Sequence, residues 1–204
     1  MYFLSPTRTG RAELLEKRSR FIALAEPVSS EDEARKILAS VRAEHHSARH
    51  NVWCCILPDG EKRYSDDGEP SGSAGAPVAQ MLEKRAIRGV ICVVTRYFGG
   101  VLLGPGGLAR AYTRAAQDAA DDSALTRFVA RLVTLTECSY AFLPILRDAV
   151  SRERGVIAGA QYAEDVLLTA IFEKERASSF IVRVRELSGG TVIPEITGET
   201  IIEA

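Results

Sequence analysis

The stretch TRYFGGVLLGPGGLARAYTRA, residues 95–115, is the most informative part of the sequence. It continues the run VICVVTRYF, residues 90–98, whose first part is continuously apolar and predicts a strand in the centre of a sheet. From Gly107 onward, apolar residues recur at helical spacing and leave Arg110 on the exposed side. The segment between strand and helix contains Gly99, Gly100, Gly104, Gly106 and Gly107. A strand, a glycine-rich loop and a helix in this order predict an α/β fold.

The glycine-rich loop is the first candidate site. Glycine lacks a β-carbon, so a ligand can lie against the backbone, and the start of the following helix offers unpaired N–H groups. An anion such as phosphate suits these donors. We predict an anion-binding site made of Arg96, Tyr97, Gly99, Gly100, Gly104, Gly106, Gly107 and Arg110. The string matches neither G-x-x-x-x-G-K-S/T nor G-x-G-x-x-G, so it does not indicate an NTPase or a dinucleotide site; close packing of strand and helix is the alternative reason for the glycines.

The second candidate is the segment SDDGEPSGSAGAP, residues 65–77, whose Gly, Pro, Ser and Asp content predicts a loop. Its candidate residues are Ser65, Asp66, Asp67, Glu69, Ser71 and Ser73. We interpret it as a polar recognition loop that also caps the next helix. Magnesium held by these carboxylates is the alternative, but the spacing does not match a calcium loop, and we predict no metal and no cofactor.

A third cluster, AEHHSARHNVW, places His45, Arg49 and His50 at a predicted helix end and strand entry. No histidine pair has metal-ligand spacing on one helix. We therefore predict a basic rim at the helix C-terminus, where positive charge is favourable.

The remaining patterns place the other elements. Residues 11–28 predict two strands, Ser30 and Glu33 form a capping box for a helix that ends near Glu44, and residues 51–57 and 77–84 predict a strand and a short helix. The polar segment 117–127 is the predicted boundary between domains 1–127 and 128–204. The second domain reads as strand 131–138, helix 142–155, strands 156–163 and 165–173, helix 175–190 and strand 191–196, a ferredoxin-like β-α-β-β-α-β order.

Composition restricts the function further. A chain of 204 residues with 46% hydrophobic and 26% charged residues is typical of a folded globular protein. The net charge of −1 excludes a uniformly basic surface, so any polyanion must bind at a local patch. Four cysteines without a C-x-x-C pair predict reduced core thiols. Without a signal-like or membrane-spanning stretch, we expect a cytoplasmic protein with no membrane partner.

Four ordered motifs together resemble the YigZ/IMPACT family: KRSRF at 17–21, ARHNVW at 48–53, SDDGEPSGSAG at 65–75 and RYFGGVLLGPGGLARAY at 96–112. The resemblance implies an N-terminal fold like the second domain of a small-subunit ribosomal protein, with helices on one face of a sheet. It also implies a second domain similar to the last domain of elongation factor G. Eukaryotic relatives act in translation control by binding a scaffold that activates a starvation-sensing kinase. Pro105 and Ser73 depart from the family pattern, and the proline removes one N–H donor.

These observations lead to three functional hypotheses. The first is a translation-linked binding protein that contacts RNA, the ribosome or a translation factor through the glycine-rich site, with Arg49, Arg96 and Arg110 on phosphates. The second is an enzyme for a small phosphorylated substrate, with Asp67 or Glu69 as a base or metal ligand. The third is a protein-interaction module without any anion.

Overall fold

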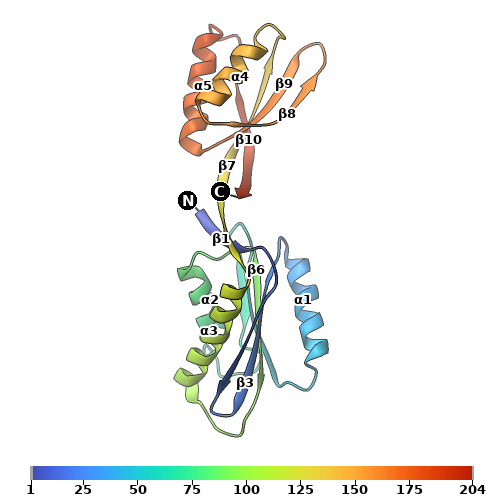
Figure 1. Cartoon of the computed structure of the whole chain (residues 1–204), viewed down its shortest axis with the longest axis vertical. Helices are drawn as coiled ribbons and strands as arrows, with labels where there is room; N and C mark the ends of the chain where they lie inside the picture. The colour runs from blue at the N-terminus through green and yellow to red at the C-terminus, as the bar shows by residue number, and fades with distance from the viewer. Residues whose placement is uncertain (1, 204) are drawn as a thin grey trace. The chain divides into compact units, whose positions relative to one another are not determined.

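The computed structural model describes residues 2–203 (Figure 1). These residues form two compact units, the first being Tyr2–Arg127 and the second beginning at Phe128. The first unit contains both loops that the sequence singles out. Each unit has its own hydrophobic core.

The first unit is built on a five-stranded antiparallel sheet. In spatial order its strands are β2 (Gly10–Glu16), β3 (Ser19–Pro27), β6 (Val90–Tyr97), β4 (His50–Ile56) and β5 (Lys62–Ser65). Strand β6 is central, and its first seven residues are buried, which agrees with its continuous apolar sequence. The short strand β1 (Tyr2–Pro6) is not part of this sheet, and it exchanges backbone hydrogen bonds with residues 86 and 88 through Leu4.

Helices cover both faces of this sheet, as Figure 1 shows. Helices α2 (Gly75–Lys84) and α3 (Gly104–Asp122) pack on one face, and α1 (Glu31–Glu44) packs on the other. The expectation of helices on one face only is therefore wrong. The reason is the alternation of a central strand: Cys92 and Val94 of β6 join the core under α2 and α3, whereas Ile91 and Val93 join the core under α1.

Cys54, Cys55 and Cys92 lie in these cores and Cys138 lies in the core of the second unit, all as free thiols. Cys54 and Cys55 are neighbours on β4 and therefore point to opposite faces, Cys54 toward α2 and α3 and Cys55 toward α1. Burial raises the pKa of Cys55 to about 11 and that of Cys92 to about 12. These thiols stay protonated at neutral pH.

Three element bounds differ from the sequence-based expectation. Helix α3 begins at Gly104, not near Gly107, and it extends to Asp122 through much of the predicted boundary segment. Ala116, Ala119 and Ala120 are fully buried, so the buried stripe of the helix continues beneath a polar exposed face. The following strand, β7 (Leu125–Cys138), begins six residues before the predicted Arg131.

The second unit has the β-α-β-β-α-β order that the sequence predicts. After β7 come α4 (Leu143–Arg152), β8 (Val156–Tyr162), β9 (Val166–Phe172), α5 (Lys174–Leu187) and β10 (Glu195–Glu203). Strands β10, β7, β9 and β8 are neighbours in this order and pair antiparallel, which is a ferredoxin-like sheet. The α/β class of both halves is thus confirmed.

The last strand lies later than predicted. Residues 191–194 form the connection after α5, where the backbone N–H of Val192 donates to Ser188 Oγ at 3.1 Å and the Val192 side chain enters the core. Pairing with β7 begins only at Glu195. Within residues 2–203, no helix is both long and apolar enough to cross a membrane.

Candidate functional site

The glycine-rich loop joins β6 to α3. Gly100 and Gly104 have φ angles of +81° and +70°, a backbone region that residues with side chains rarely adopt. The loop is open to solvent, and Leu102 is 83% exposed. Within residues 2–203, no side-chain hydrogen bond caps the first turn of α3, in which Pro105 follows Gly104. The backbone donors of this turn are therefore available to an external acceptor.

The turn between β2 and β3 packs directly against this loop. A β-carbon on Gly99 would lie 2.0 Å from the carbonyl carbon and oxygen of Arg18, so only glycine allows the two backbones to approach so closely. Lys17 and Arg18 both have positive φ angles, 44° and 66°, in this turn. The contact brings two basic residues beside the glycine-rich loop.

An open groove of about 810 Å³ lies between this turn and α3. We call it the basic groove; it is lined by Leu14, Glu16, Lys17, Leu103, Gly107, Ala109, Arg110, Ala111, Thr113, Arg114, Gln117 and Asp118. Arg114 lies 3.9 Å from Asp118, whereas Lys17 and Arg110 have no ion-pair partner in the described part of the chain. Two unpaired cations and one carboxylate without an ion-pair partner in residues 2–203, that of Glu16, thus line an accessible cavity, and Lys17, Arg110 and Arg114 outnumber Glu16 and Asp118.

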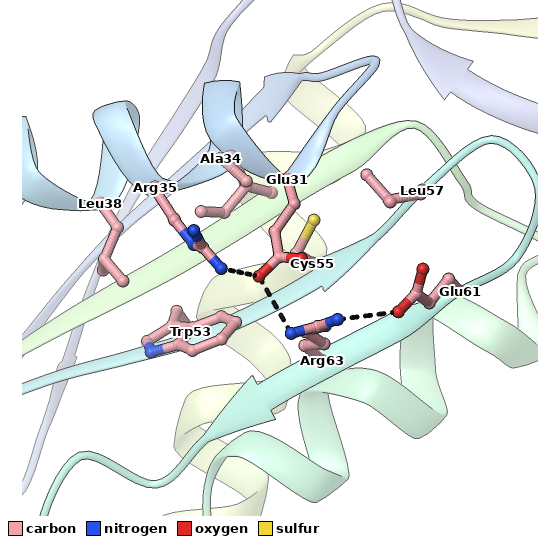
Figure 2. Close-up of a pocket in the computed structure, with 10 residues that line it drawn as sticks. Glu31, Ala34, Arg35, Leu38, Trp53, Cys55, Leu57, Glu61 and Arg63 are labelled. Atoms are coloured by element: carbon pink, nitrogen blue, oxygen red, sulfur yellow. Dashed lines mark hydrogen bonds and ion pairs between the residues drawn. The ribbon is translucent and has the colours of Figure 1, made fainter.

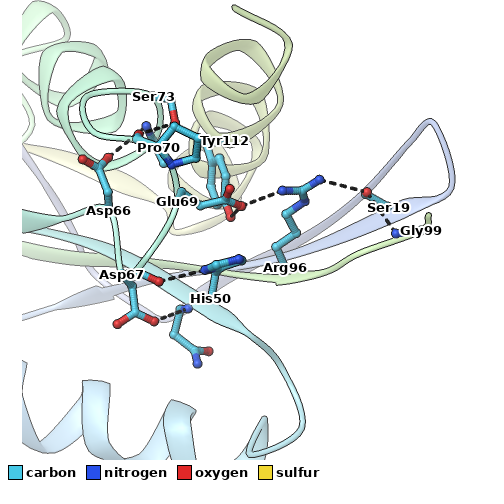
Figure 3. A network of polar contacts seen from close by, with 12 residues as sticks. Ser19, His50, Asp66, Asp67, Glu69, Pro70, Ser73, Arg96, Gly99 and Tyr112 are labelled. Atoms are coloured by element: carbon cyan, nitrogen blue, oxygen red, sulfur yellow. Dashed lines mark hydrogen bonds and ion pairs between the residues drawn. The ribbon is translucent and has the colours of Figure 1, made fainter. Parts of the chain in front are cut away.

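Arg96 lies elsewhere than the prediction places it. Its side chain is only 7% exposed, and Nη1 donates to Glu69 Oε1 at 2.7 Å (Figure 3). Nη2 donates to Ser19 Oγ at 3.3 Å, and the same oxygen accepts from the backbone N–H of Gly99 at 3.2 Å. The prediction of Arg96 as an anion ligand is corrected: its charge is neutralised by a buried carboxylate, and it supports the loop from below.

Glu69 joins the acidic loop to this support. It is buried, and besides Arg96 it accepts a 2.7 Å hydrogen bond from the hydroxyl of Tyr112 on α3. Burial, and then the hydrogen bond to Glu69, raise the pKa of Tyr112, so this phenol remains a donor. The two loops are therefore linked through buried polar contacts, while no acidic-loop residue lines the basic groove.

The other carboxylates of the acidic loop hold backbone. Asp66 Oδ1 accepts from the N–H groups of Ala74 and Gly75 at 3.0 and 2.8 Å, which caps α2, and Oδ2 accepts from Gly72 at 2.8 Å. Asp67 accepts from the N–H of Asn51 at 2.7 Å and from Arg42 at 2.7 Å.

The serines of the loop have mixed positions. Ser65 Oγ accepts from the N–H of Asp67, and buried Ser73 donates to the carbonyl of Pro70 at 2.6 Å. Ser71 is exposed. Across residues 2–203, no group of three or more His, Cys, Asp or Glu side chains could hold a metal ion.

The three residues of the predicted basic rim differ in exposure and in their contacts. His45 Nδ1 lies 3.0 Å from the hydroxyl of Tyr97, and His50 Nδ1 lies 2.8 Å from the carbonyl oxygen of Asp67. Of His45, Arg49 and His50, only Arg49 is exposed. The strand entry thus turns His50 toward the acidic loop, and His45 contacts Tyr97 of the predicted anion site. A basic rim at this helix end stays a prediction.

Comparison with known proteins assigns the family. The family described as the Impact N-terminal domain matches residues 17–120, which include every residue of both loops. The chain is 32% identical to the IMPACT family member YigZ of Escherichia coli, over 86% of this chain and 88% of that protein. The chain belongs to the IMPACT family.

Other IMPACT relatives differ in how much of them the chain covers. The IMPACT family member YvyE of Bacillus subtilis is 29% identical over 92% of this chain and 88% of its own length. Protein IMPACT of Rattus norvegicus is 32% identical, over 46% of this chain and 31% of that protein. A solved structure titled "Crystal structure of an hypothetical protein" matches with a TM-score of 0.64 and 28% identity, covering 97% of this chain and 98% of that one.

Sequence reasoning missed three residues of this IMPACT-family site. Ser19 and Tyr112 complete the buried contacts of Glu69 and Arg96, and Lys17 lines the basic groove. Lys17 and Ser19 lie within the KRSRF motif, but their relation to Gly99 depends on a turn that packs against a loop 80 residues away in sequence. No local pattern contains that information.

Proposed function

We propose that this IMPACT-family protein is a translation-linked binding protein that contacts RNA, free or within the ribosome, through the basic groove. The observation that carries the proposal is the pair of unpaired cations, Lys17 and Arg110, on opposite walls of an open groove beside an uncapped helix start. The link to translation rests on the role that the family resemblance implies for eukaryotic relatives.

The charge distribution supports a local contact. The whole chain has a net charge of −1, so long-range attraction of a polyanion is weak and binding has to come from a patch. Phosphates bind Lys and Arg side chains and the N–H groups of helix starts, which are the groups present here. The loop beside them contains five glycines, which have no side chains to obstruct a phosphate backbone.

The enzyme hypothesis receives no comparable support. Asp66 and Asp67 bind backbone N–H groups and an arginine, and Glu69 is held by Arg96 and Tyr112. A general base or metal ligand needs a free oxygen at a cavity. None of these carboxylates lines the basic groove.

The test is direct binding of a short, labelled single-stranded RNA by fluorescence anisotropy. We expect wild-type protein to bind, and Lys17→Ala combined with Arg110→Ala to weaken binding by more than about tenfold. Arg152→Ala is the matched control, because this exposed arginine is already paired with Asp148 at 2.6 Å and lies in the second unit. An equal effect of the control variant would contradict the proposal.

A pull-down from cell extract separates RNA from protein partners. Nuclease treatment should release the bound material if RNA carries the contact. Material that stays bound after nuclease, with undiminished binding by the double variant, would favour a protein-interaction module instead.

A further inference from the structure

A second cavity lies on the opposite face of the sheet in the first unit, between α1 and strands β4 and β5 (Figure 2). Its volume is about 210 Å³, and it shares no lining residue with the basic groove. The apolar lining residues are Ala34, Leu38, Trp53, Cys55, Leu57 and Ile91. Nothing in the proposed RNA contact uses this pocket.

The size of the pocket limits its occupant. Small-molecule sites in proteins commonly enclose roughly 300–1,000 Å³, and this one is smaller. One branched aliphatic or aromatic side chain is the group that such a space admits. The walls offer such a group hydrophobic contact, and Trp53 adds an aromatic surface.

The mouth of the pocket carries charges of both signs. Glu31 Oε1 accepts from Arg35 at 2.6 Å and from Arg63 at 3.0 Å, and Arg63 also pairs with Glu61 at 3.0 Å (Figure 2). These side chains reach across from α1 to the edge strand β5. The two arginines are 66% and 52% exposed, so their ion pairs are screened by water and can be exchanged at little cost.

An occupant that is complementary to such a mouth carries both charges. A carboxylate can replace Glu31 as the partner of Arg35 and Arg63, because a guanidinium binds carboxylates in a defined geometry. An ammonium group can in turn bind the carboxylates of Glu31 and Glu61. A ligand with only a carboxylate would pair with the two arginines and repel the two glutamates. A ligand with only an ammonium group would pair with the glutamates and repel the arginines.

We propose that this pocket binds a free amino acid with a large apolar side chain. The side chain enters between Leu38, Trp53 and Leu57, the α-carboxylate pairs with Arg35 and Arg63, and the α-ammonium pairs with Glu31 and Glu61. The site is independent of the basic groove, and its failure would leave the proposed RNA contact untouched.

The test uses the intrinsic fluorescence of Trp53, the single tryptophan of the chain, in the full-length protein. L-leucine is the probe. We expect a saturable change in Trp53 emission, and a binding enthalpy by calorimetry at the same midpoint. The analogues 4-methylpentanoate and 3-methylbutylamine, which each keep one charge, should bind about tenfold more weakly. Glycine, which has no side chain to bury, should give no saturable change.

Variants of the charged residues at the mouth test whether these residues contact the ligand. Arg63→Gln should weaken L-leucine binding about tenfold without changing the affinity for 3-methylbutylamine, and Glu31→Gln should weaken binding of both ammonium compounds. Arg20→Gln is the matched control, because Arg20 forms an exposed pair with Glu13 at 2.7 Å on β2 and β3. Both arginines are exposed, so neither substitution should disturb folding.

Three results would overturn the proposal. These are an emission that never saturates with L-leucine, equal affinity for the singly charged analogues, or an equal loss in Arg20→Gln. Each would mean that the charged residues at the mouth only cover the apolar opening.

Discussion

At the scale of single residues, the buried pair of Glu69 and Arg96 connects the acidic loop to the glycine-rich loop. Replacing Glu69 by Gln leaves the guanidinium buried without a counter-charge. We expect the free energy of unfolding to fall by about 3–5 kcal/mol, which urea unfolding monitored by Trp53 fluorescence measures. Glu13→Gln is the control, because it removes an exposed partner of Arg20 and should change stability little. A loss in Glu69→Gln no larger than in the control would show that the pair contributes nothing.

Buried thiols make stability depend on pH. Burial raises the folded-state pKa of Cys55 to about 11 and that of Cys92 to about 12, above the unfolded value near 9.0. The unfolded chain therefore loses these protons first as pH rises, and the stability present below pH 9.0 is lost as pH rises above it.

The slope should reach about 1.4 kcal/mol per pH unit for each such thiol, measured by urea unfolding under reducing conditions. Cys92→Ala should show a shallower decline than wild type at alkaline pH, whatever its stability at neutral pH. Parallel curves for the two proteins would contradict this explanation.

The sequence identifies candidate site residues but not the partners that they contact in the fold. The glycines, the acidic residues and the basic residues could be named as candidates, because their composition departs from that of ordinary strands and helices. The sequence could not show whether Arg96 is free or paired, because folding brings its partner Glu69 next to it. An arginine beside a glycine-rich loop gives the same sequence pattern whether it is free to bind a ligand or paired with a carboxylate.

At the scale of elements, the glycine-rich loop is held by the turn between β2 and β3. Gly99→Ala would place a methyl group 2.0 Å from the backbone of Arg18, so the turn or the loop has to move. We expect a loss of about 1–3 kcal/mol in unfolding free energy, and weaker RNA binding because Lys17 moves with the turn.

Gly106→Ala is the matched control for this change. Its nearest neighbour would be Arg110 Nη1 at 3.6 Å, and its φ angle is not positive, so the first turn of α3 accommodates alanine. Stability should stay the same or rise by up to about 1 kcal/mol. Equal destabilisation by both substitutions in thermal unfolding would refute the contact with the turn.

Sequence periodicity predicts whether a segment is a helix or a strand. It does not predict which face of the sheet a helix covers. The apolar run of β6 and the capping box of α1 are local signals, and both elements form where they are predicted. The face that α1 covers is not local, because β6 is buried on both sides and its sequence fits a helix on either. The short strand β5 lacks a periodic pattern long enough to detect.

At the scale of the whole molecule, the two units have separate cores. Phe180 is fully buried in the core of the second unit and stacks on Phe172, with the two ring centroids 4.5 Å apart. Phe180→Ala should destabilise that unit by about 3–5 kcal/mol. We expect the urea midpoint of Trp53 fluorescence, which reports the first unit, to stay unchanged while circular dichroism shows an earlier partial transition. An equal shift of the Trp53 midpoint would show that the units unfold together.

The net charge of the whole chain bears on whether RNA is attracted to one site or to the entire surface. A chain with a net charge of −1 that binds RNA through a few cations should release few counterions. The number of phosphates contacted can therefore be read from the dependence of affinity on salt.

The most direct measurement is the slope of log K for single-stranded RNA against log salt concentration, for wild type and for Arg110→Ala. We expect a negative slope of about 0.7 per phosphate contacted, and a slope smaller by about 0.7 in Arg110→Ala. An affinity that does not change with salt, or the same slope in both proteins, would contradict the claim that the basic groove binds a phosphate backbone.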